Sequence, residues 1–588
     1  MSGLDSFPKS IGSGVVLELR DSAEQSLVPT NAFSTSYLER RLEIDKNPLA
    51  HNGTTSEKTD QVPSDYIEAQ IGSSGHEDVQ IRQNCPISSL QSAEVNCRVL
   101  VQPSEIDGFE IPDARWVTLL PRHVQAGSDD SILGVKCLAV HETPEHTSFS
   151  IQKPLPCNIF LGPYDDSVGV ANRSRLPLHI RHSASVGSSE ADLNDRINIA
   201  IPAHSTSTLA PGAWEFSQAD SPCAFQVLVF PRRHILEVVA LSMRVVAGHK
   251  RDATGQGAPA QPTVENSPVT RRLGCLSEMT HGEQARLYAP DANDEEIEKS
   301  DYSLFRMRRL GETKSAVVFQ ARHSAYAERI IVVKALKRRS GRDLVSRGLS
   351  WEKEMEVHLN IHSDYIVKLL GGDARIHAIF LENIDARDLS HESWRDREIG
   401  QKFRGTIVHA QCILYDMARA LQYLRRKKIL HNDIKPPNIL FNGKKAVLID
   451  FGLGTFDGAR AADGGTPWYV PPEYNRIHER KAPSDMWALG VVMLYVLRQI
   501  GLPETGVDVP SWVIRDVGTV GPARVQMETW IQKIEREAVK IAAEDSKLGG
   551  VVSRMLHKRP LERVTADELV SAMEVLMPCG SESKTPDT

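Results

Sequence analysis

Two short segments combine acidic, basic and amide side chains at spacings suited to phosphate chemistry. The first, 430-LHNDIKPPNILF-441, places Asp433 two residues before Lys435 and five before Asn438. The second, 447-VLIDFGLG-454, places Asp450 at the end of an apolar run. A carboxylate can orient and deprotonate a hydroxyl, an ammonium can neutralise phosphate charge, and hard oxygen ligands can hold Mg²⁺. The order and spacing of these residues therefore favour phosphoryl transfer over a pair of polar turns.

The two segments resemble the catalytic and magnesium-binding loops of the eukaryotic protein kinases. The resemblance covers residues 302–577 and implies ATP and Mg²⁺ as cofactors. It implies that Asp433 and Lys435 are catalytic and that Asn438 and Asp450 bind the metal. Lys435, and Thr466 in the segment 465-GTPWYVPPEY-474, look like the serine/threonine branch. The expected substrates are therefore Ser and Thr hydroxyls of proteins.

The nucleotide contacts implied by the resemblance lie upstream. Lys334 closes the strand-like run 330-IIVVK-334 and would contact the α- and β-phosphates. Its partner is expected on the following helix, where the alignment selects Glu354 and leaves Glu352 and Glu356 as alternatives. The other nucleotide-binding positions are expected at Leu310, Gly311, Val318, Glu382 and Ile384.

The phosphate-covering loop departs from the family pattern G-x-G-x-x-G-x-V. It reads 311-GETKSAVV-318, so that Thr313 and Ala316 replace the second and third glycines. Glycine there permits unusual backbone angles and a close approach of N–H groups to phosphate, whereas a β-branched residue restricts the turn. We expect weaker or slower nucleotide binding.

The catalytic loop also departs from the family, because Asn432 stands where many kinases have Arg. In the family this Arg meets a phosphorylated residue of the activation loop. An uncharged Asn cannot do so, and Thr455 is the only hydroxyl between Asp450 and Gly465. The two observations predict that activation-loop phosphorylation does not switch this kinase.

Three further matches are structural. The resemblance pairs Glu473 with Arg563 in a buried ion pair and makes Asp485 the acid that braces the catalytic loop. Removing one member of a buried pair typically costs about 3–5 kcal/mol.

The elements that must position these residues indicate a multidomain chain of 588 residues. We predict an α+β bilobal kinase fold at 302–577, strand-rich first and helix-rich later. An all-β, sandwich-like domain is predicted at 93–247, with an amphipathic helix near 234–247. Residues 1–92, apart from a short helix near 36–44, and the tail 578–588 are predicted to be disordered, and 248–301 to be a flexible linker.

The region 93–247 faintly resembles a forkhead-associated sandwich, through Asn-x-Ser at 172–174 and the turn 209-LAPGAW-214. The family's usual phosphate-binding features are absent. We expect this domain to bind a partner, to recruit substrates or to regulate the kinase.

Composition bounds the remaining possibilities. The formal net charge of −7 argues against a nucleic-acid binder, and no apolar run reaches the 18 or so residues that span a bilayer. The 8 cysteines include no C-x-x-C pair, and no signal peptide is visible. These features predict an intracellular protein, cytoplasmic or nuclear.

Two rivals to an active serine/threonine kinase remain open. One is a pseudokinase, a kinase-shaped binding module whose altered glycine loop no longer supports turnover. The other places the main role in the β-rich region, as a peptide-binding adaptor that delivers the kinase.

Overall fold

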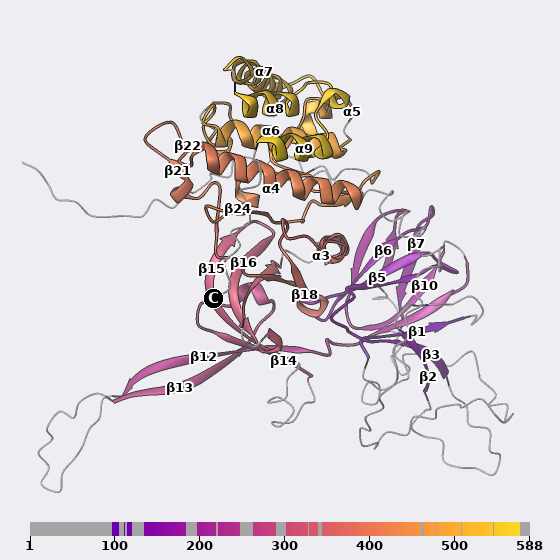
Figure 1. Cartoon of the computed structure of the whole chain (residues 1–588). Coiled ribbons are helices and arrows are strands. Elements are labelled where there is room, and N and C mark those ends of the chain that lie inside the picture. The colour runs from indigo at the N-terminus through magenta and orange to yellow at the C-terminus, as the bar shows by residue number, and fades with distance from the viewer. Residues whose placement is uncertain are drawn as a thin grey trace, which may run out of the picture.

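The computed structural model describes most of the chain from residue 97 onward (Figure 1). The described residues are 97–104, 111, 114–119, 135–183, 197–218, 221–246, 263–289, 302–326, 329–338, 344–459, 464–477, 479–506, 508–544 and 546–576. The predictions of disorder for 1–92 and 578–588, and of a helix at 36–44, lie outside them. No helix among the described residues combines the length and apolar character needed to cross a bilayer.

The first domain is a β-sandwich, as predicted. One sheet has the order β2-β3-β1-β11-β10-β7-β8 and the other β4-β5-β6-β9, both antiparallel. Their inner faces alternate along each strand and share one core; Ile159 and Val170 belong to one sheet and Val101 and Phe216 to the other. The resemblance to forkhead-associated domains stays a prediction. The strands are β1 Val99–Pro103, β2 Ala114–Leu119, β3 Val135–Val140, β4 Ser148–Ile151, β5 Cys157–Leu161, β6 Val168–Asn172, β7 Leu178–His182, β8 Asn198–Ile201, β9 Thr206–Leu209, β10 Gly212–Ser217 and β11 Phe225–Val229.

The predicted helix near 234–247 is wrong. The segment forms strand β12 (Ile235–Val246), in which Leu236 and Val238 are buried, whereas Ile235, Glu237 and Val239 are partly exposed. Valine and isoleucine fill five of its twelve positions, and β-branched side chains pack well in strands. The segment therefore follows its two-residue apolar alternation and forms a strand, although its apolar residues also fit helical spacing.

The predicted linker at 248–301 is also wrong in part, because residues 263–289 are ordered. They contain β13 (Thr263–Arg272) and β14 (Gln284–Tyr288), both antiparallel to β12. Strand β14 in turn pairs with β15 (Tyr302–Glu312), the first strand of the predicted kinase domain. The stretch is thus part of the kinase domain's own sheet.

That sheet has eight strands in the order β13-β12-β14-β15-β16-β17-β19-β18. Its remaining strands are β16 (Ala316–His323), β17 (Ile330–Leu336), β18 (Leu369–Asp373) and β19 (Ala378–Glu382). Helix α3 (Leu344–Leu359) connects β17 to β18 and lies between the sheet and the β-sandwich (Figure 1). Trp351 and Met355 of α3 pack on the sheet. The kinase fold is therefore covered on this side by a second domain.

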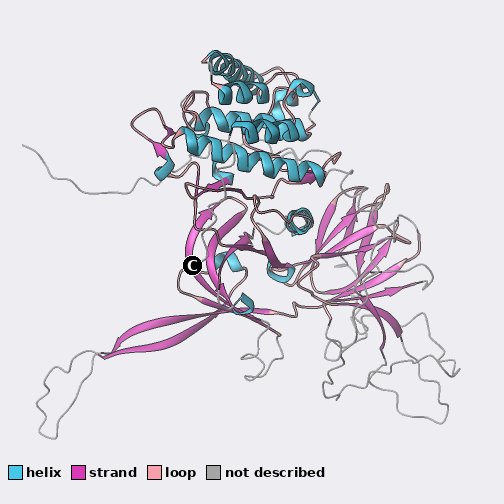
Figure 2. Cartoon of the chain, viewed as in Figure 1, coloured by secondary structure: helices cyan, strands magenta, loops and turns pink. Residues whose placement is uncertain are grey.

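The second lobe is helical, as predicted (Figure 2). Helix α6 is buried almost throughout and forms its centre. One three-stranded sheet (β20–β24–β25) and two strand pairs (β21–β22 and β23–β26), all antiparallel, accompany the helices. The helices are α4 Ile407–Arg426, α5 Tyr474–Ile477, α6 Ala482–Val496, α7 Pro522–Ala543, α8 Lys547–Met555 and α9 Ala566–Leu576, and the strands are β20 Arg387–Asp388, β21 Arg395–Asp396, β22 Lys402–Phe403, β23 Ile429–Leu430, β24 Ile439–Phe441, β25 Ala446–Leu448 and β26 Thr455–Phe456.

Candidate active site

Lys334, on strand β17, lies between two carboxylates. Its Nζ lies 2.7 and 2.8 Å from the two carboxylate oxygens of Glu354 on α3, and 2.7 Å from Asp450 Oδ1. Of the three glutamates that the sequence offers on this helix, Glu354 is the one that faces the lysine. Glu356 is exposed, and Glu352 accepts hydrogen bonds from the β-sandwich.

The charges of this cluster stabilise one another. Burial alone would lower the pKa of Lys334, but the Asp450 and Glu354 carboxylates raise it above its usual value. The lysine ammonium in turn lowers the pKa of Asp450. Lys334 is therefore a cation and Asp450 an anion across the physiological range.

Asp433 and Lys435 lie in a second polar cluster, on the catalytic loop. Lys435 Nζ is 2.7 Å from Asp433 Oδ2 and donates to Thr466 Oγ1 at 2.9 Å. Thr466 donates to Asp433 Oδ1 at 2.9 Å. Asn438 Nδ2 adds a bond to the Asp433 main-chain oxygen at 2.8 Å and one to Oδ2 at 3.2 Å. These contacts fix the orientation of the Asp433 carboxylate.

Asn438 and Asp450 lie at the same edge of the β24–β25 hairpin. Asn438 directly precedes β24 and Asp450 is the second residue after β25; these strands pair antiparallel. The N–H of Ile449 donates to the main-chain oxygen of Asn438 at 2.9 Å.

The donor set at this edge fits Mg²⁺. Both hydrogen bonds of the Asn438 side chain use Nδ2, which leaves its amide oxygen for a cation, and the Asp450 side chain is 43% exposed. Mg²⁺ prefers one or two protein oxygens, together with waters and substrate phosphates.

The glycine-loop positions lie in one row across the sheet. Gly311 is opposite Val318, and Val318 is opposite Lys334. Directly opposed residues point to the same face, so Val318 and Lys334 share one face of the sheet. Leu310 precedes this row and is exposed.

Thr313 changes the chemistry of the loop. Its Oγ1 accepts from the N–H groups of Ser315 at 3.2 Å and Ala316 at 3.0 Å. These are loop amides of the kind that a glycine-rich loop offers to phosphate.

The expected adenine-binding segment follows β19. The main chain of Glu382 pairs with Lys368, and its Oε1 accepts from the Lys368 N–H at 2.8 Å. Ile384 lies two residues beyond, and its main-chain oxygen accepts from Ala386. Glu382 thus anchors the start of this segment to Lys368, which precedes β18.

Helix α6 holds the catalytic loop in place through Asp485. The Asp485 carboxylate accepts from the N–H groups of His431 at 2.8 Å and Asn432 at 2.9 Å. Asn432 has a left-handed backbone, with φ of 65°, a conformation that asparagine tolerates better than most residues. Asp450 is also left-handed, with φ of 68°. Such backbone conformations cluster where a site needs a side chain aimed precisely.

Asn432 ties the catalytic loop to the activation segment through neutral bonds. Its Nδ2 donates to Leu453 O at 3.0 Å and Thr455 Oγ1 at 2.9 Å. Thr455 is 4% exposed and belongs to β26. The hydroxyl that phosphorylation would require is therefore buried and already bonded.

Sequence reasoning missed Arg480 and Glu504. The Arg480 guanidinium donates to the main-chain oxygens of Asn432 and Gly464, which joins the catalytic loop to the end of the activation segment. Glu504 accepts from Tyr469 OH at 2.8 Å, and burial raises the pKa of Glu504 to about 7. In the sequence both look like solvated charges, because nothing local shows that a lone Arg or Glu becomes buried.

The ion pair predicted between Glu473 and Arg563 is present. Arg563 donates from two nitrogens to the two oxygens of Glu473, at 2.8 and 2.6 Å. The Arg563 side chain is fully buried, stacks on Trp487 and also donates to three main-chain oxygens. This pair fixes the segment after Thr466 to the helical lobe.

The comparisons with known proteins agree with this geometry. Residues 305–573 match the family model described as protein kinase domain. The chain is 27% identical over 243 residues to an LRR receptor-like serine/threonine-protein kinase of Arabidopsis thaliana, covering 38% of this chain and 22% of that protein. It is 31% identical over 198 residues to a calcium and calcium/calmodulin-dependent serine/threonine-protein kinase of Oryza sativa subsp. japonica, covering 32% and 35%. It is 25% identical over 271 residues to an Aurora kinase of Debaryomyces hansenii, covering 45% and 59%.

The chain thus spans less than two thirds of the length of each of these relatives. The residues that match the family model include the two-lobed region that holds Lys334, Asp433 and Asp450. Residues 305–573 therefore match the protein kinase domain family, and this chain is similar to kinases that include the serine/threonine type.

Proposed function

We propose that this chain is an active protein kinase that transfers the γ-phosphoryl group of ATP to Ser or Thr hydroxyls of protein substrates. One observation carries the proposal: Lys334 contacts Glu354 and Asp450 together, each at 2.7 Å. A scaffold would have no chemical need to hold an ammonium between two carboxylates and, separately, to orient a third acid, Asp433.

The residues divide the work of phosphoryl transfer. Asp433 orients the substrate hydroxyl and accepts its proton as the oxygen–phosphorus bond forms and the bond from the γ-phosphorus to the ADP oxygen breaks. Lys435 lies 2.7 Å from Asp433 and stabilises the charge on the transferring group. Lys334, oriented by Glu354, binds the α- and β-phosphates.

Asn438 and Asp450 would hold Mg²⁺, which supplies charge neutralisation at the phosphates when it is bound. On the sheet side, Leu310, Gly311 and Val318 cover the nucleotide, and the main chain of Glu382 and Ile384 binds the adenine.

The activation segment needs no phosphate in this proposal. Asn432 and Arg480 already tie it to the catalytic loop, through bonds to Leu453, Thr455 and Gly464. Activity should therefore stay within about twofold after phosphatase treatment. A tenfold loss that maps to a phosphate on Thr455 would contradict this part of the proposal.

The alternative is a pseudokinase, and one observation favours it. Thr313 Oγ1 already accepts from two loop amides of the kind that would bind phosphate. This arrangement weakens nucleotide binding without removing any catalytic group.

The test is transfer of radiolabelled phosphate from Mg·ATP to a generic Ser/Thr protein substrate. Asp433→Asn and Asp450→Asn keep the side-chain shape and should each abolish transfer. Asp364→Ala is the matched control, because the Asp364 side chain is 75% exposed and forms a surface ion pair with Lys368, four residues away. Absence of both transfer and nucleotide binding in folded wild-type protein would favour the pseudokinase.

A further inference from the structure

The β-sandwich packs directly against helix α3 through an apolar contact that we call the α3 seam. Buried side chains from both domains form one cluster there. The members of the α3 seam are Phe160, Ala171, Leu344, Val345 and Leu349. The first two belong to strands β5 and β6 and the other three to α3. The seam therefore joins segments of the two domains that lie far apart in the sequence.

Phe160 is buried by the kinase domain rather than by its own. Along β5, Ile159 points into the sandwich core, whereas Phe160 points to the opposite face and packs on α3. Both side chains are 0% exposed. A large aromatic side chain on the outer face of a sandwich would be exposed if α3 did not cover it.

Two glycines allow the close approach of the two domains. A β-carbon on Gly348 of α3 would lie 2.7 Å from Phe160 Cδ1, and one on Gly169 of β6 would lie 2.6 Å from a methyl of Val345. Glycine in a helix interior costs about 1 kcal/mol relative to alanine. Gly348 therefore lowers the stability of the isolated helix but leaves room for Phe160 to contact it.

Glu352 links the same helix to the sandwich by hydrogen bonds. Its Oε1 accepts from Thr147 Oγ1 at 2.5 Å and from Ser148 Oγ at 2.7 Å. Glu354 lies two residues further on, and residues two apart on a helix point to nearly opposite sides. One side of α3 thus holds the sandwich while the other presents Glu354 to Lys334.

A second contact joins the sandwich to the kinase domain outside α3. The N–H of Ala374, in the loop after β18, donates to Pro144 O at 2.8 Å. Tyr164 OH lies 3.0 Å from Nδ1 of the fully buried His377, and burial lowers the pKa of this histidine to about 3. The pair is therefore a neutral hydrogen bond.

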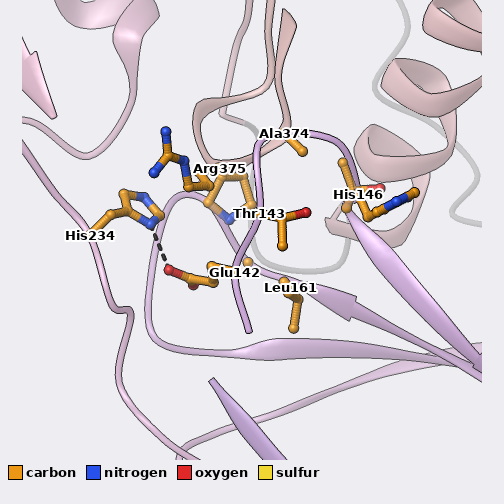
Figure 3. Close-up of a pocket in the computed structure, with 10 residues that line it drawn as sticks. Glu142, Thr143, His146, Leu161, His234, Ala374 and Arg375 are labelled. Carbon is orange, nitrogen blue, oxygen red and sulfur yellow. Dashed lines mark hydrogen bonds and ion pairs between the residues drawn. The ribbon is translucent and has the colours of Figure 1, made fainter. Parts of the chain in front are cut away.

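The joint between the two domains contains a small pocket. Figure 3 shows Glu142 and Thr143 of the sandwich near Ala374 and Arg375 of the kinase domain, around a cavity of about 10 Å³. That volume holds about one water molecule. The joint is thus a packed contact rather than a ligand site.

The other end of α3 reaches the magnesium-binding loop. The ring of His358 lies 5.1 Å from that of Phe451, the residue after Asp450, and Phe451 in turn packs on His431 at 4.8 Å. The placement of α3 therefore affects both the partner of Lys334 and the packing of the loop that carries Asp450.

We infer that the β-sandwich holds α3 where Glu354 binds Lys334, so that Phe160, Thr147 and Ser148 are positioning residues for the active site. The inference rests on the proposed kinase activity. In the structure the docked sandwich and the formed Lys334–Glu354 pair occur together, and the inference takes the sandwich to support this arrangement. The sandwich then acts as a built-in partner of α3, rather than as a tethered module.

The experiment compares Phe160→Ala with Ile159→Ala in the full-length chain. The two residues are neighbours on β5, but only Phe160 contacts α3. We expect Phe160→Ala to lower kcat and to raise KM for ATP, with kcat/KM for ATP falling at least about fivefold. KM for a peptide substrate should stay within twofold, because Lys435 and Thr466 lie on the other lobe. Ile159→Ala should leave all three constants unchanged in folded protein.

A second set of variants does not depend on cavity formation. Thr147→Val with Ser148→Ala removes the two bonds to Glu352 and should reproduce the effect on ATP kinetics. Thr147→Ser with Ser148→Thr keeps both hydroxyls and should retain wild-type values. A loss in both double variants would mean that the hydroxyls do not act through Glu352 and would overturn their assignment.

The glycine offers a test by non-additivity. Gly348→Ala should lower kcat because its β-carbon meets Phe160, although alanine stabilises an isolated helix. Combined with Phe160→Ala, the clash is relieved, so the double variant should lose less than the product of the two single losses. Strict additivity would count against the seam.

Hydrogen exchange of the α3 amides separates this inference from the proposed function, since it needs no turnover. Exchange across 344–359 should be at least about tenfold faster in Phe160→Ala than in wild type or Ile159→Ala. Faster exchange in Phe160→Ala, without any phosphoryl transfer in wild type, would refute the kinase proposal. It would still support the role of the α3 seam in holding α3. Unchanged exchange, or wild-type ATP kinetics in Phe160→Ala, would overturn the inference.

Discussion

Removal of residues 1–301 tests whether the kinase domain begins where its family resemblance begins. The chain 302–588 retains every expected catalytic residue but loses strands β12, β13 and β14. Strand β14 pairs with β15 over four residue pairs, from Gln284–Phe305 to Leu287–Tyr302. The deleted strands and the turn between β13 and β14 also supply seven buried apolar residues to the core beneath the sheet: Leu236, Val238, Leu273, Leu276, Met279, Ala285 and Leu287.

The expected loss is comparable with the stability of the whole domain. Six of the seven side chains are large, and burying each contributes about 1.5–3 kcal/mol, or about 9–18 kcal/mol together. These values are upper estimates, and about half of the contact area belongs to the remaining domain, which leaves a loss of about 5–10 kcal/mol. Net stabilities of domains are about 5–15 kcal/mol. We therefore expect 302–588 to be unfolded or aggregated.

The assay compares 302–588, 232–588 and the full-length chain by soluble yield and guanidinium unfolding followed by tryptophan fluorescence. The chain 232–588 keeps β12–β14 and should fold. Its unfolding midpoint should be lower than that of the full-length chain, because loss of the sandwich uncovers Leu344, Val345 and Leu349 of α3. If 302–588 folds with the same midpoint as 232–588, the three strands contribute no stability and the reasoning is refuted.

Three further outcomes are expected. Arg563→Met should lower the free energy of unfolding by about 3–5 kcal/mol in urea titrations, because it leaves the Glu473 carboxylate buried without its partner; adding Glu473→Leu should recover part of that loss, and no recovery would contradict an ion-pair effect. Burial raises the pKa of Glu504 to about 7. Ionisation of this carboxylate therefore destabilises the folded protein increasingly as pH rises through about 4.5–7, and the destabilisation is complete above pH 7. Glu504→Gln should therefore stabilise the protein by about 2–3 kcal/mol at pH 8.5 and by much less at pH 5, whereas an equal gain at both pH values would exclude titration of this group. Thr313→Gly should lower KM for ATP by about two- to tenfold, because it frees the N–H groups of Ser315 and Ala316, and an unchanged or higher KM would show that these amides do not meet phosphate.

The chemistry-bearing residues could be predicted from sequence because phosphoryl transfer fixes their types and their local spacing. Asp433, Lys435 and Asn438 lie within six residues, and a short hairpin brings Asp450 beside them. Such contacts depend on local geometry, which the letters encode directly. For the partner of Lys334 the sequence favours Glu354 and leaves Glu352 and Glu356 as alternatives; the rotation of α3 against the sheet excludes these two, because it turns Glu354 toward the lysine.

The strand at 235–246 could not be assigned from its letters. Apolar residues there fit a helical stripe and a two-residue alternation equally well, so the outcome depends on whether partner strands are present. β13 and β14 supply them, and both come from a stretch that looks like a linker because its composition is polar and rich in Pro and Gly.

The sequence alone determined the kinase fold, the expected catalytic set and the presence of a β-rich domain, since each rests on motifs or on periodicity within one segment. The tertiary structure decided what the two domains do to each other. Phe160 and Gly348 carry no signal in the sequence, because burial between domains is a property of both surfaces at once. Only their contact reveals that the sandwich holds the helix that carries Glu354.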